Sequence, residues 1–512
     1  MCGIVGMFNH SDEQALVAML SDTVHRGEDN TKYQFFDGRV GLGINRLSIV
    51  DLERGDQPLH NETGDVHVVC NGEIYNHQAL RMDLSATHAL GTGSDAEVIS
   101  HLYEDHGDDC VKLLDGMYAF VLYDQNRGRF LAARDALGIK PLYYAREGER
   151  WYFASEAKAL LAAGVEPQTV RSLPPGYRLT ERGPEQYYYR ASHKSFPNPK
   201  MVRTLLDHAV QKRMTVADVE VGTFLSGGLD SSLVTAIAAQ YNPNLQAFTV
   251  GMEGRPDVVA ARQLGEHLGI RHHVRTFTVD EMFELLPEAI WHVESYNPSM
   301  VTGSVVTLMA ARFAKDLGIK VVLCGEGSDE IFAGYKALRN MPWPELEQAT
   351  WTLIQNLHKT ELQRLDRMSM AVSLEARVPF MDRDLVEYAL NLPAEVKIKE
   401  VDGRLVEKYI LREAFEDLLP HDLLWREKMP FDQGSGGRSI IEVVNGRVTD
   451  DEFEDAKREH PEAQLVSKEA YYYFKIWREH FGEMGGRRVF DMFGDYPVMM
   501  DGIKQRTAES GS

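Results

Sequence analysis

The stretch FLSGGLDSSLVTAIAAQ, residues 224–240, constrains the fold of this 512-residue chain more than any other. An apolar strand-like run leads into two adjacent glycines, and a helix-forming run starts at Asp230. Glycines let backbone amides surround an anion, serine hydroxyls add donors, and a helix start carries partial positive charge. A plain turn would use the same residues only for tightness and capping. The complete SGGLDSS favours a phosphate-binding turn, although it lacks the GxxxxGK[ST] pattern of a Walker A loop.

Strand-like and helical runs alternate on both sides of this turn. The strand-like runs are VEVGTFL, LQAFTVGM and IKVVLCG, and the helical runs are DSSLVTAIAAQ and DVVAARQLGEHLG. Such alternation predicts a parallel sheet with helices on its faces, which binds ligands at the carboxyl ends of its strands. After Gly334 the pattern is mostly helical, including EARVPFMDRDLVEYALNL.

A second loop that suits phosphate chemistry follows another apolar strand, in VVLCGEGSDEIFAGY, residues 321–335. Asp230 and Asp329 would lie at the ends of separate strands of one sheet. Mg²⁺ is commonly held by one or two carboxylates together with phosphate oxygens. We therefore predict that these two residues are metal ligands, with an acidic surface loop as the alternative.

The first 189 residues have a different pattern, with short strand-like runs such as VHVVCNGEIYN and YAFVLYD between Gly, Asn and Asp turns. We predict an α+β domain over residues 2–189 and a linker over 190–200, where RASHKSFPNPK lacks periodicity. A second domain is expected over 201–500. Residues 501–512 are expected to form a disordered tail.

The cysteine directly behind the start methionine, in MCGIVGMF, is the most reactive candidate in the first domain. Removal of Met1 would give Cys2 a thiol and a free α-amino group on one residue, a nucleophile with its own base. The alternative is a small buried hydrophobe.

Composition excludes several classes of protein. The net charge is −22, and no stripe of basic residues suggests a nucleic-acid partner. No basic and apolar leader and no run of 18 apolar residues occurs, so we expect a cytoplasmic protein with no membrane partner. The four cysteines are scattered, and no Cys/His ligand spacing predicts a disulfide framework or a zinc site.

With these motifs in view, the chain resembles the glutamine-hydrolysing asparagine synthetases over roughly residues 2–480. The resemblance rests on the ordered motifs MCGIVG, HRGEDN, RLSIVD, NGEIYNH, TGSDAEVI, ARDALGIKPLYY, FASEAKAL, LSGGLDSS, CGEGSDEIFAGY and LEARVPF. It implies an N-terminal Ntn-hydrolase-type glutaminase domain, an αββα sandwich. An α/β PP-loop ATPase domain with a parallel sheet and a helical C-terminal part would follow.

For the first domain, the resemblance implies that Cys2 attacks the glutamine side-chain amide with its own α-amino group as the base. Asn71 and the Gly72 amide would form the oxyanion hole. Arg46 would bind the glutamine carboxylate and Asp95 its ammonium group. Glu73 is also expected in the glutamine site.

For the second domain, the resemblance implies adenylation of a carboxylate by ATP and attack of ammonia on the adenylate. The expected ATP-binding residues are Ser226, Gly227, Gly228, Asp230, Ser231, Val250, Cys324 and Gly325. Glu326 and Lys428 are expected to be catalytic, Lys428 as a point charge beside the phosphates. The expected substrates are glutamine, ATP and a carboxylic acid, most simply aspartate, with Mg²⁺ as the metal, and the family leads us to expect a homodimer.

Some positions depart from the family pattern. Glu28 replaces a usual Pro, Cys324 a usual Ser, and Ala333 a usual Gly. The stretches Lys428–Gly437 and Asn297–Val305 also differ from those of the asparagine synthetases. Three alternatives therefore stay open: amidation of another carboxylate, closure of a β-lactam ring, which Cys2 argues against, and an inactive regulatory homologue.

Overall fold

The computed structural model describes residues 2–191, 193–429 and 431–482. The chain divides into two compact units. The first contains residues up to Arg190 with two short later segments, Val216–Glu220 and Met370–Glu375, and the second contains the rest. The predicted tail, residues 501–512, lies outside the described residues.

The first unit is built on two antiparallel sheets of six strands each. The first sheet has the order β10-β8-β9-β1-β3-β2 and the second the order β12-β11-β7-β6-β5-β4. The strands are β1 (Cys2–Phe8), β2 (Asn30–Phe36), β3 (Val40–Arg46), β4 (Leu59–His60), β5 (Val66–Ile74), β6 (Gly116–Asp124), β7 (Arg129–Arg134), β8 (Tyr143–Glu147), β9 (Arg150–Ala154), β10 (Arg171–Ser172), β11 (Tyr177–Thr180) and β12 (Gly183–Gln186).

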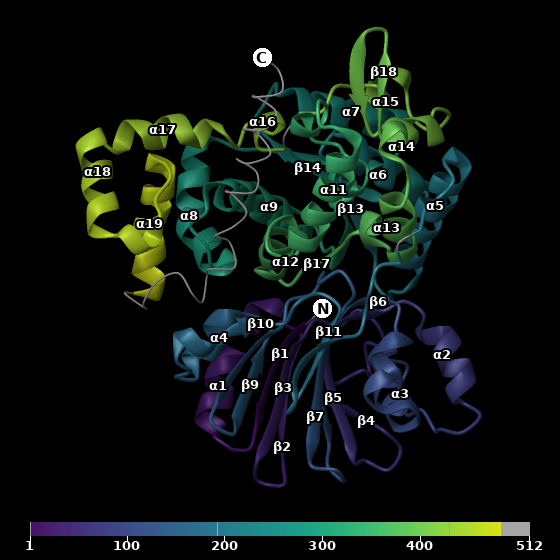
Figure 1. The fold of residues 1–512 in the computed structure, drawn as a ribbon, viewed down its shortest axis with the longest axis vertical. Coiled ribbons are helices and arrows are strands. Elements are labelled where there is room, and N and C mark those ends of the chain that lie inside the picture. Colours follow the sequence, from purple (N-terminus) through teal and green to yellow (C-terminus); the bar gives the residue numbers. More distant parts are fainter. Residues whose placement is uncertain (1, 192, 430, 483–512) are drawn as a thin grey trace. The chain divides into compact units, whose positions relative to one another are not determined.

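Helices cover the outer faces of these two sheets. The helices α1 (Glu13–Asp22) and α4 (Ala157–Ala162) pack on the first sheet, and α3 (Val98–His106) packs on the second beside α2 (His77–Leu84) (Figure 1). Because successive side chains of a strand point to opposite faces, Val69 of β5 packs between the two sheets and Val68 packs towards α3. The four layers confirm the predicted αββα sandwich.

The second unit contains a five-stranded sheet of order β15-β14-β13-β16-β17. The strands are β13 (Val221–Phe224), β14 (Gln246–Gly251), β15 (Arg271–Thr276), β16 (Val321–Leu323) and β17 (Glu375–Arg377). Strands β15, β14, β13 and β16 pair in parallel, which confirms the α/β class. The stretch EAR was expected in a helical region, but it forms β17 at the edge of this sheet.

Helices account for most of the remaining second unit. They are α5 (Pro199–Thr215), α6 (Leu229–Tyr241), α7 (Pro256–Leu268), α8 (Val279–Val293), α9 (Pro298–Asp316), α10 (Ser328–Ile331), α11 (Trp343–Leu357), α12 (Glu361–Met370), α13 (Arg383–Leu390), α14 (Tyr409–Ala414), α15 (His421–Leu424), α16 (Phe431–Gly434), α17 (Ser439–Arg447), α18 (Asp450–Glu459) and α19 (Lys468–Phe481). A two-stranded hairpin, β18 (Ile398–Val401) and β19 (Arg404–Glu407), precedes α14.

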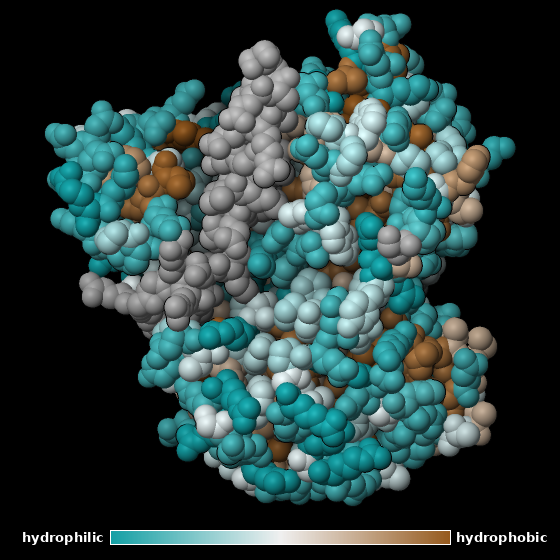
Figure 2. Space-filling model, viewed as in Figure 1, coloured by the Kyte–Doolittle hydropathy of each residue, from teal (hydrophilic) through white to brown (hydrophobic). Residues whose placement is uncertain are grey.

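Hydrophilic residues cover most of the face seen in Figure 2. Among the described residues, none of the helices combines the length and the apolar character that a membrane crossing requires.

Candidate functional site

The predicted nucleophile, Cys2, is the first residue of β1 and is 5% exposed. Its backbone nitrogen donates to Oδ1 of Asn71 at 3.1 Å, which joins the two residues although 69 positions separate them. Burial raises the pKa of the Cys2 thiol, and the nearby N-terminal charge opposes this shift only in part. The Cys2 thiol therefore holds its proton more tightly than an exposed cysteine does.

Asn71 lies in the middle of β5 and is fully buried. Its Oδ1 accepts from Cys2, whereas its Nδ2 has no hydrogen-bond partner among the described residues. Gly72 follows with φ of 151°, where an added Cβ would collide with the backbone of Met117 and Tyr118 on β6. A buried amide donor without a partner is unusual, and this one belongs to the residue that contacts Cys2.

Arg46 and Asp95 are tied to the strands that carry Cys2 and Asn71. Arg46 is the last residue of β3, and Asp95 is hydrogen-bonded to the end of β5. Arg46 is directly opposite Cys2 in the β1–β3 register. Its guanidinium donates to Asp56 at 2.9 Å and to the carbonyls of Val50 and Asp51 at 3.1 and 2.7 Å. These bonds use three of its five N–H donors and fix the plane of the group.

Asp95 is 5% exposed and accepts the backbone N–H of Ile74, the last residue of β5, at 2.6 Å. Burial raises the pKa of Asp95, and the neighbouring His77 counteracts part of the rise. Glu73 follows Gly72 on β5 and is buried, at 3% exposure. All six predicted glutaminase residues thus lie on or beside β1, β3 and β5.

A charged network supports the Cys2 backbone and was missed by sequence reasoning. The buried Arg26 donates to the carbonyl oxygen of Cys2 at 3.2 Å and to Glu156 at 2.7 Å. Glu156 is fully buried and is also contacted by His25 at 3.2 Å and by Lys158. These residues belong to the motifs HRGEDN and FASEAKAL, but only the fold shows that the motifs meet.

The predicted phosphate-binding turn joins β13 to α6. Gly227 has φ of 81°, and an added Cβ would collide with the Asp257 carbonyl. The hydroxyls of Ser226 and Ser231 are 2.9 Å apart, and the Ser231 hydroxyl also accepts the backbone N–H of Ser226 at 3.1 Å. Gly228 precedes the first turn of α6, so its loop ends at a helix N-terminus, as the sequence predicts.

The predicted metal ligands, Asp230 and Asp329, lie close together and share one lysine. Nζ of Lys408 contacts both oxygens of Asp230 at 2.6 and 2.7 Å and Oδ1 of Asp329 at 2.8 Å. Lys428 contacts the other oxygen of Asp329. Although burial would raise the pKa of Asp329, the charges of Lys408 and Lys428 lower it strongly. One cation therefore already bridges the two carboxylates.

Sequence reasoning missed Lys408. It precedes α14 with φ of 55°, its side chain is 3% exposed, and 178 residues separate it from Asp230. Arg426 was missed as well, and it donates to the carbonyl of Gly227 at 2.9 Å and to Asp257 at 2.6 Å.

The other predicted synthetase residues lie on β14 or directly after β16. An added Cβ on Gly325 would lie 2.7 Å from the Ser231 nitrogen, so this glycine permits the contact with the phosphate-binding turn. Cys324 is buried, and its nitrogen donates to the Arg377 carbonyl at 2.9 Å. Val250 is buried on β14.

Burial raises the pKa of Glu326. The charge of Arg364, at 4.0 Å, opposes part of this rise. Asp230 is one of the charges that contribute to the same rise. The charge of Asp230 therefore acts on the ionisation of Glu326.

The two stretches that depart from the family pattern have different surroundings. The Ser435 carbonyl, in the 428–437 stretch, accepts the backbone N–H of Met252 just after β14, at 2.8 Å. Thr302, in the 297–305 stretch, contacts Glu469 and Tyr473 of α19 at 2.8 and 3.1 Å. The first stretch thus adjoins the strand ends of the site, whereas Thr302 packs against another helix.

Family comparisons cover nearly the whole chain. A family model described as "Glutamine amidotransferase domain" matches residues 1–190, and one described as "Asparagine synthase" matches residues 201–345 and 339–486. Asparagine synthetase [glutamine-hydrolyzing] 2 of Arabidopsis thaliana is 38% identical over 519 residues, which cover 95% of this chain and 89% of the relative. Asparagine synthetase [glutamine-hydrolyzing] of Sandersonia aurantiaca is 38% identical over 517 residues, covering 94% and 97%.

Among solved structures, the glutamine phosphoribosylpyrophosphate amidotransferase from B. subtilis is similar with a TM-score of 0.34. It is 18% identical and covers 54% of this chain and 81% of its own. The assignment of the fold therefore rests on the sheets and on the family matches.

Proposed function

The chain belongs to the family of glutamine-hydrolysing asparagine synthetases, and from this we propose that it makes asparagine from aspartate, glutamine and ATP. The observation that carries the proposal is the match of both family models in order, with Cys2 held against Asn71 in one unit and two aspartates facing two lysines in the other.

In the glutaminase reaction, removal of Met1 turns the Cys2 nitrogen into an α-amine, which takes the thiol proton. Sγ then bonds to the amide carbon of glutamine, and the carbonyl oxygen becomes negatively charged. The Asn71 Nδ2 and the Gly72 N–H are the proposed donors to this oxygen. The protonated α-amine then gives this proton to the amide nitrogen, the C–N bond breaks, and ammonia leaves. Water hydrolyses the thioester to glutamate and restores the Cys2 thiol.

Glutamine is held by charges at its other end. The N–H donors of Arg46 not used by Asp56, Val50 and Asp51 suit a carboxylate, because the guanidinium is fixed and charged. The Asp95 carboxyl group is proposed to bind the ammonium group, and Glu73, which is buried on β5, is proposed to belong to the same glutamine site. These roles also explain why two charged side chains are tolerated in a buried site.

In the synthetase reaction, the aspartate side chain attacks the α-phosphorus of ATP, and pyrophosphate leaves. Ammonia then attacks the acyl carbon, and AMP leaves. The turn formed by Ser226, Gly227, Gly228 and Ser231 is proposed to bind the phosphates, near Val250, Cys324 and Gly325. Lys428 and Lys408 are proposed to neutralise the negative charge of the leaving pyrophosphate, and Glu326 is proposed to act near the acceptor.

The residues present fit Mg²⁺ at Asp230 and Asp329, because a single Nζ already contacts oxygens of both carboxylates at 2.6 and 2.8 Å. When bound, Mg²⁺ would add positive charge at the pyrophosphate. Both lysines would then be free to turn from the carboxylates to the phosphate oxygens.

We further propose a cytoplasmic location, supported by four free cysteines, one of them the nucleophile, which suit a reducing compartment. The homodimer stays a prediction from the family.

The acceptor is tested by pyrophosphate release with ATP, Mg²⁺ and glutamine. We expect release to depend on aspartate, with asparagine identified by mass, and glutamate or β-alanine to give little. Turnover only with another carboxylic acid would overturn the choice of aspartate and would point to the altered 428–437 stretch.

A further inference from the structure

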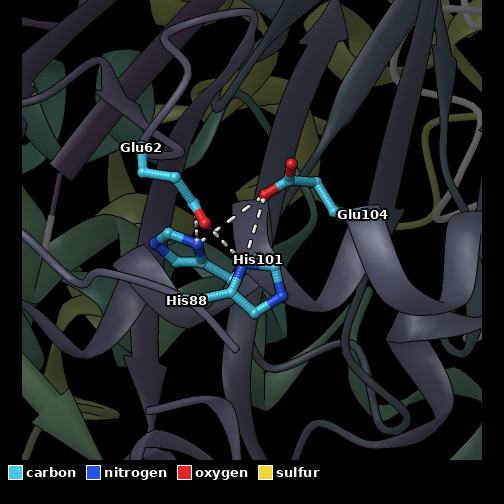
Figure 3. A group of neighbouring side chains, drawn as sticks. All are labelled: Glu62, His88, His101 and Glu104. Atoms are coloured by element: carbon cyan, nitrogen blue, oxygen red, sulfur yellow. Dashed lines mark hydrogen bonds and ion pairs between the residues drawn. The ribbon is translucent and has the colours of Figure 1, made fainter. Parts of the chain in front are cut away.

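Two histidines and two glutamates gather in the first unit at a place that the proposed reactions do not use. They are Glu62, His88, His101 and Glu104, shown in Figure 3. Glu62 lies between β4 and β5, His88 follows α2, and His101 and Glu104 are one turn apart on α3. One potential ligand atom from each residue lies within 4.8 Å of all the others.

The contact distances suit one small cation. Nδ1 of His88 and Nδ1 of His101 are each 2.9 Å from an oxygen of Glu62, and they are 3.6 and 3.7 Å from Oε2 of Glu104. Zinc ligands at about 2.1 Å in a tetrahedron lie about 3.4 Å from one another. The four distances scatter around this value.

His101 is the strongest sign that a ligand belongs here. It is fully buried, and neither ring nitrogen has a hydrogen bond among the described residues, although Glu62 lies at 2.9 Å. A buried imidazole without hydrogen bonds is unfavourable. A metal ion bound to Nδ1 would satisfy the nitrogen that faces the two glutamates in Figure 3.

The outer nitrogens of both histidines face further carboxylates. Nε2 of His88 is 3.3 Å from Asp105, and Nε2 of His101 is 3.8 Å from Glu97. Histidine ligands of metals commonly present one nitrogen to the metal and the other to a carboxylate, which orients the ring.

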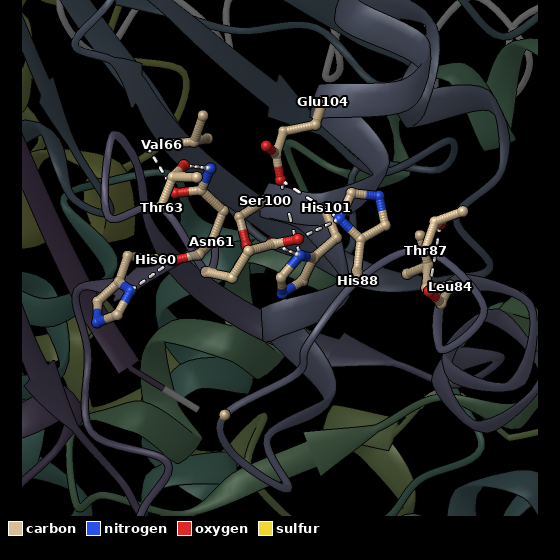
Figure 4. A network of polar contacts seen from close by, with 12 residues as sticks. His60, Asn61, Thr63, Val66, Leu84, Thr87, His88, Ser100, His101 and Glu104 are labelled. Carbon is tan, nitrogen blue, oxygen red and sulfur yellow. Dashed lines mark hydrogen bonds and ion pairs between the residues drawn. The ribbon is translucent and has the colours of Figure 1, made fainter.

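The backbone on either side is also held in place, as Figure 4 shows. The Asn61 side chain donates to Thr63 and Asp65 at 2.7 Å each and accepts the N–H of Asp65 and Val66 at 3.0 Å each, which shapes the turn that carries Glu62. The N–H of His88 donates to the Leu84 carbonyl at the end of α2, at 2.9 Å. The geometry is thus fixed before any ligand binds.

We propose that Glu62, His88, His101 and Glu104 form a structural site for a divalent transition metal, with Zn²⁺ as the best match. Imidazole nitrogens favour zinc and similar metals over Mg²⁺ and Ca²⁺, and two carboxylates neutralise its charge. Because the set contains no cysteine, the spacing of cysteines in the sequence could not reveal it. The side chains of Glu62 and Glu104 are 30% and 27% exposed, which gives the ion a way in.

The site would fasten the segment that leads to Asp95. Residues 85–94 connect α2 to the 3-10 helix Asp95–Glu97, and His88 lies within them. Zinc would tie this segment to α3 and to the turn before β5.

The test uses the untagged full-length protein, dialysed against EDTA and then titrated with ZnCl₂ in the absence of ATP. We expect one zinc per chain by elemental analysis, a higher melting temperature with zinc, and a tetrahedral absorption spectrum with Co²⁺. His88→Gln and Glu104→Gln should each weaken zinc binding by more than ~100-fold, since even partners outside the ligand set typically contribute 10–100-fold. His106→Gln is the matched control, because His106 is exposed at the end of α3, the helix that carries Glu104. This variant should bind zinc as the wild type does.

Equal zinc affinity of the wild type and His88→Gln would overturn the proposal, as would the absence of zinc binding to the wild type. Binding of Mg²⁺ or Ca²⁺ in preference to zinc would overturn the choice of metal. Circular dichroism of the metal-free variants shows whether they fold, and Glu104→Gln keeps the test valid should His88→Gln not fold.

Discussion

Asn71 connects the nucleophile to the proposed oxyanion hole, because its Oδ1 contacts the Cys2 nitrogen and its Nδ2 has no partner among the described residues. Asn71→Ala should lower kcat for glutamine hydrolysis by ~10²–10³-fold, since the donor acts mainly on charge that forms in the transition state. The KM for glutamine should change much less. Steady-state glutamate release measures both constants.

Asn126→Ala is a suitable control, since Asn126 is an exposed residue of the same unit. Synthesis from added ammonia should continue in the Asn71 variant. A loss of both activities together would mean that Asn71 supports the fold and not the glutaminase step.

Several residues could be recognised from sequence only as members of motifs. Cys2, Asn71, Arg46 and Asp95 follow from the resemblance, and the fold places them around β1, β3 and β5. The backbone at Ala333 explains why the family usually has a glycine there. Its φ of 54° lies in the left-handed region, which favours glycine.

At the level of elements, α10 brings a second acidic residue into the interior beside Asp329. Glu330 is buried, and its burial together with the charge of Glu361 raises its pKa to about 8. Tyr335 donates to this carboxyl through its hydroxyl. Glu330 therefore binds its proton more tightly in the folded chain than in the unfolded chain.

This shift predicts a pH dependence of stability. The contribution of Glu330 is fully present below its unfolded pKa of about 4.3, and it is lost as the pH rises to about 8, by at most ~1.4 kcal/mol per pH unit. Glu330→Gln should remove this slope, so the variant should gain stability relative to the wild type between pH 5 and 8. Free energies of unfolding from urea titrations at a series of pH values measure the difference.

Glu345→Gln, at an exposed position of α11, should leave the slope of the wild type unchanged. Parallel pH curves for the wild type and Glu330→Gln would show that Glu330 is ionised in the folded chain.

The elements differ in how far the sequence could predict them. The strand, glycine turn and helix around Asp230 were predictable, because strong local signals follow one another within residues 224–240. Lys408 and the histidine cluster were not, because each depends on contacts between segments far apart in the chain. The EAR stretch joins the sheet as β17 because pairing with a neighbouring strand overrides a helical surrounding.

At the scale of the whole molecule, one chain combines a glutamine amidotransferase domain with an asparagine synthase domain. In the proposed function, the first unit supplies ammonia through Cys2, and the second consumes it through an adenylate formed at the Asp230 turn. Each unit contains its own charged residues for its own reaction. The two activities should therefore be separable by a single substitution.

The most direct measurement compares the wild type with Cys2→Ala, each supplied with ATP, Mg²⁺ and aspartate and either amide-¹⁵N glutamine or ammonium chloride. The wild type should form ¹⁵N-labelled asparagine from glutamine. Cys2→Ala should form none from glutamine but should keep most of the ammonia-dependent rate, because the synthetase residues are untouched. Labelled asparagine from glutamine in Cys2→Ala, or no asparagine from any source in the wild type, would contradict the account.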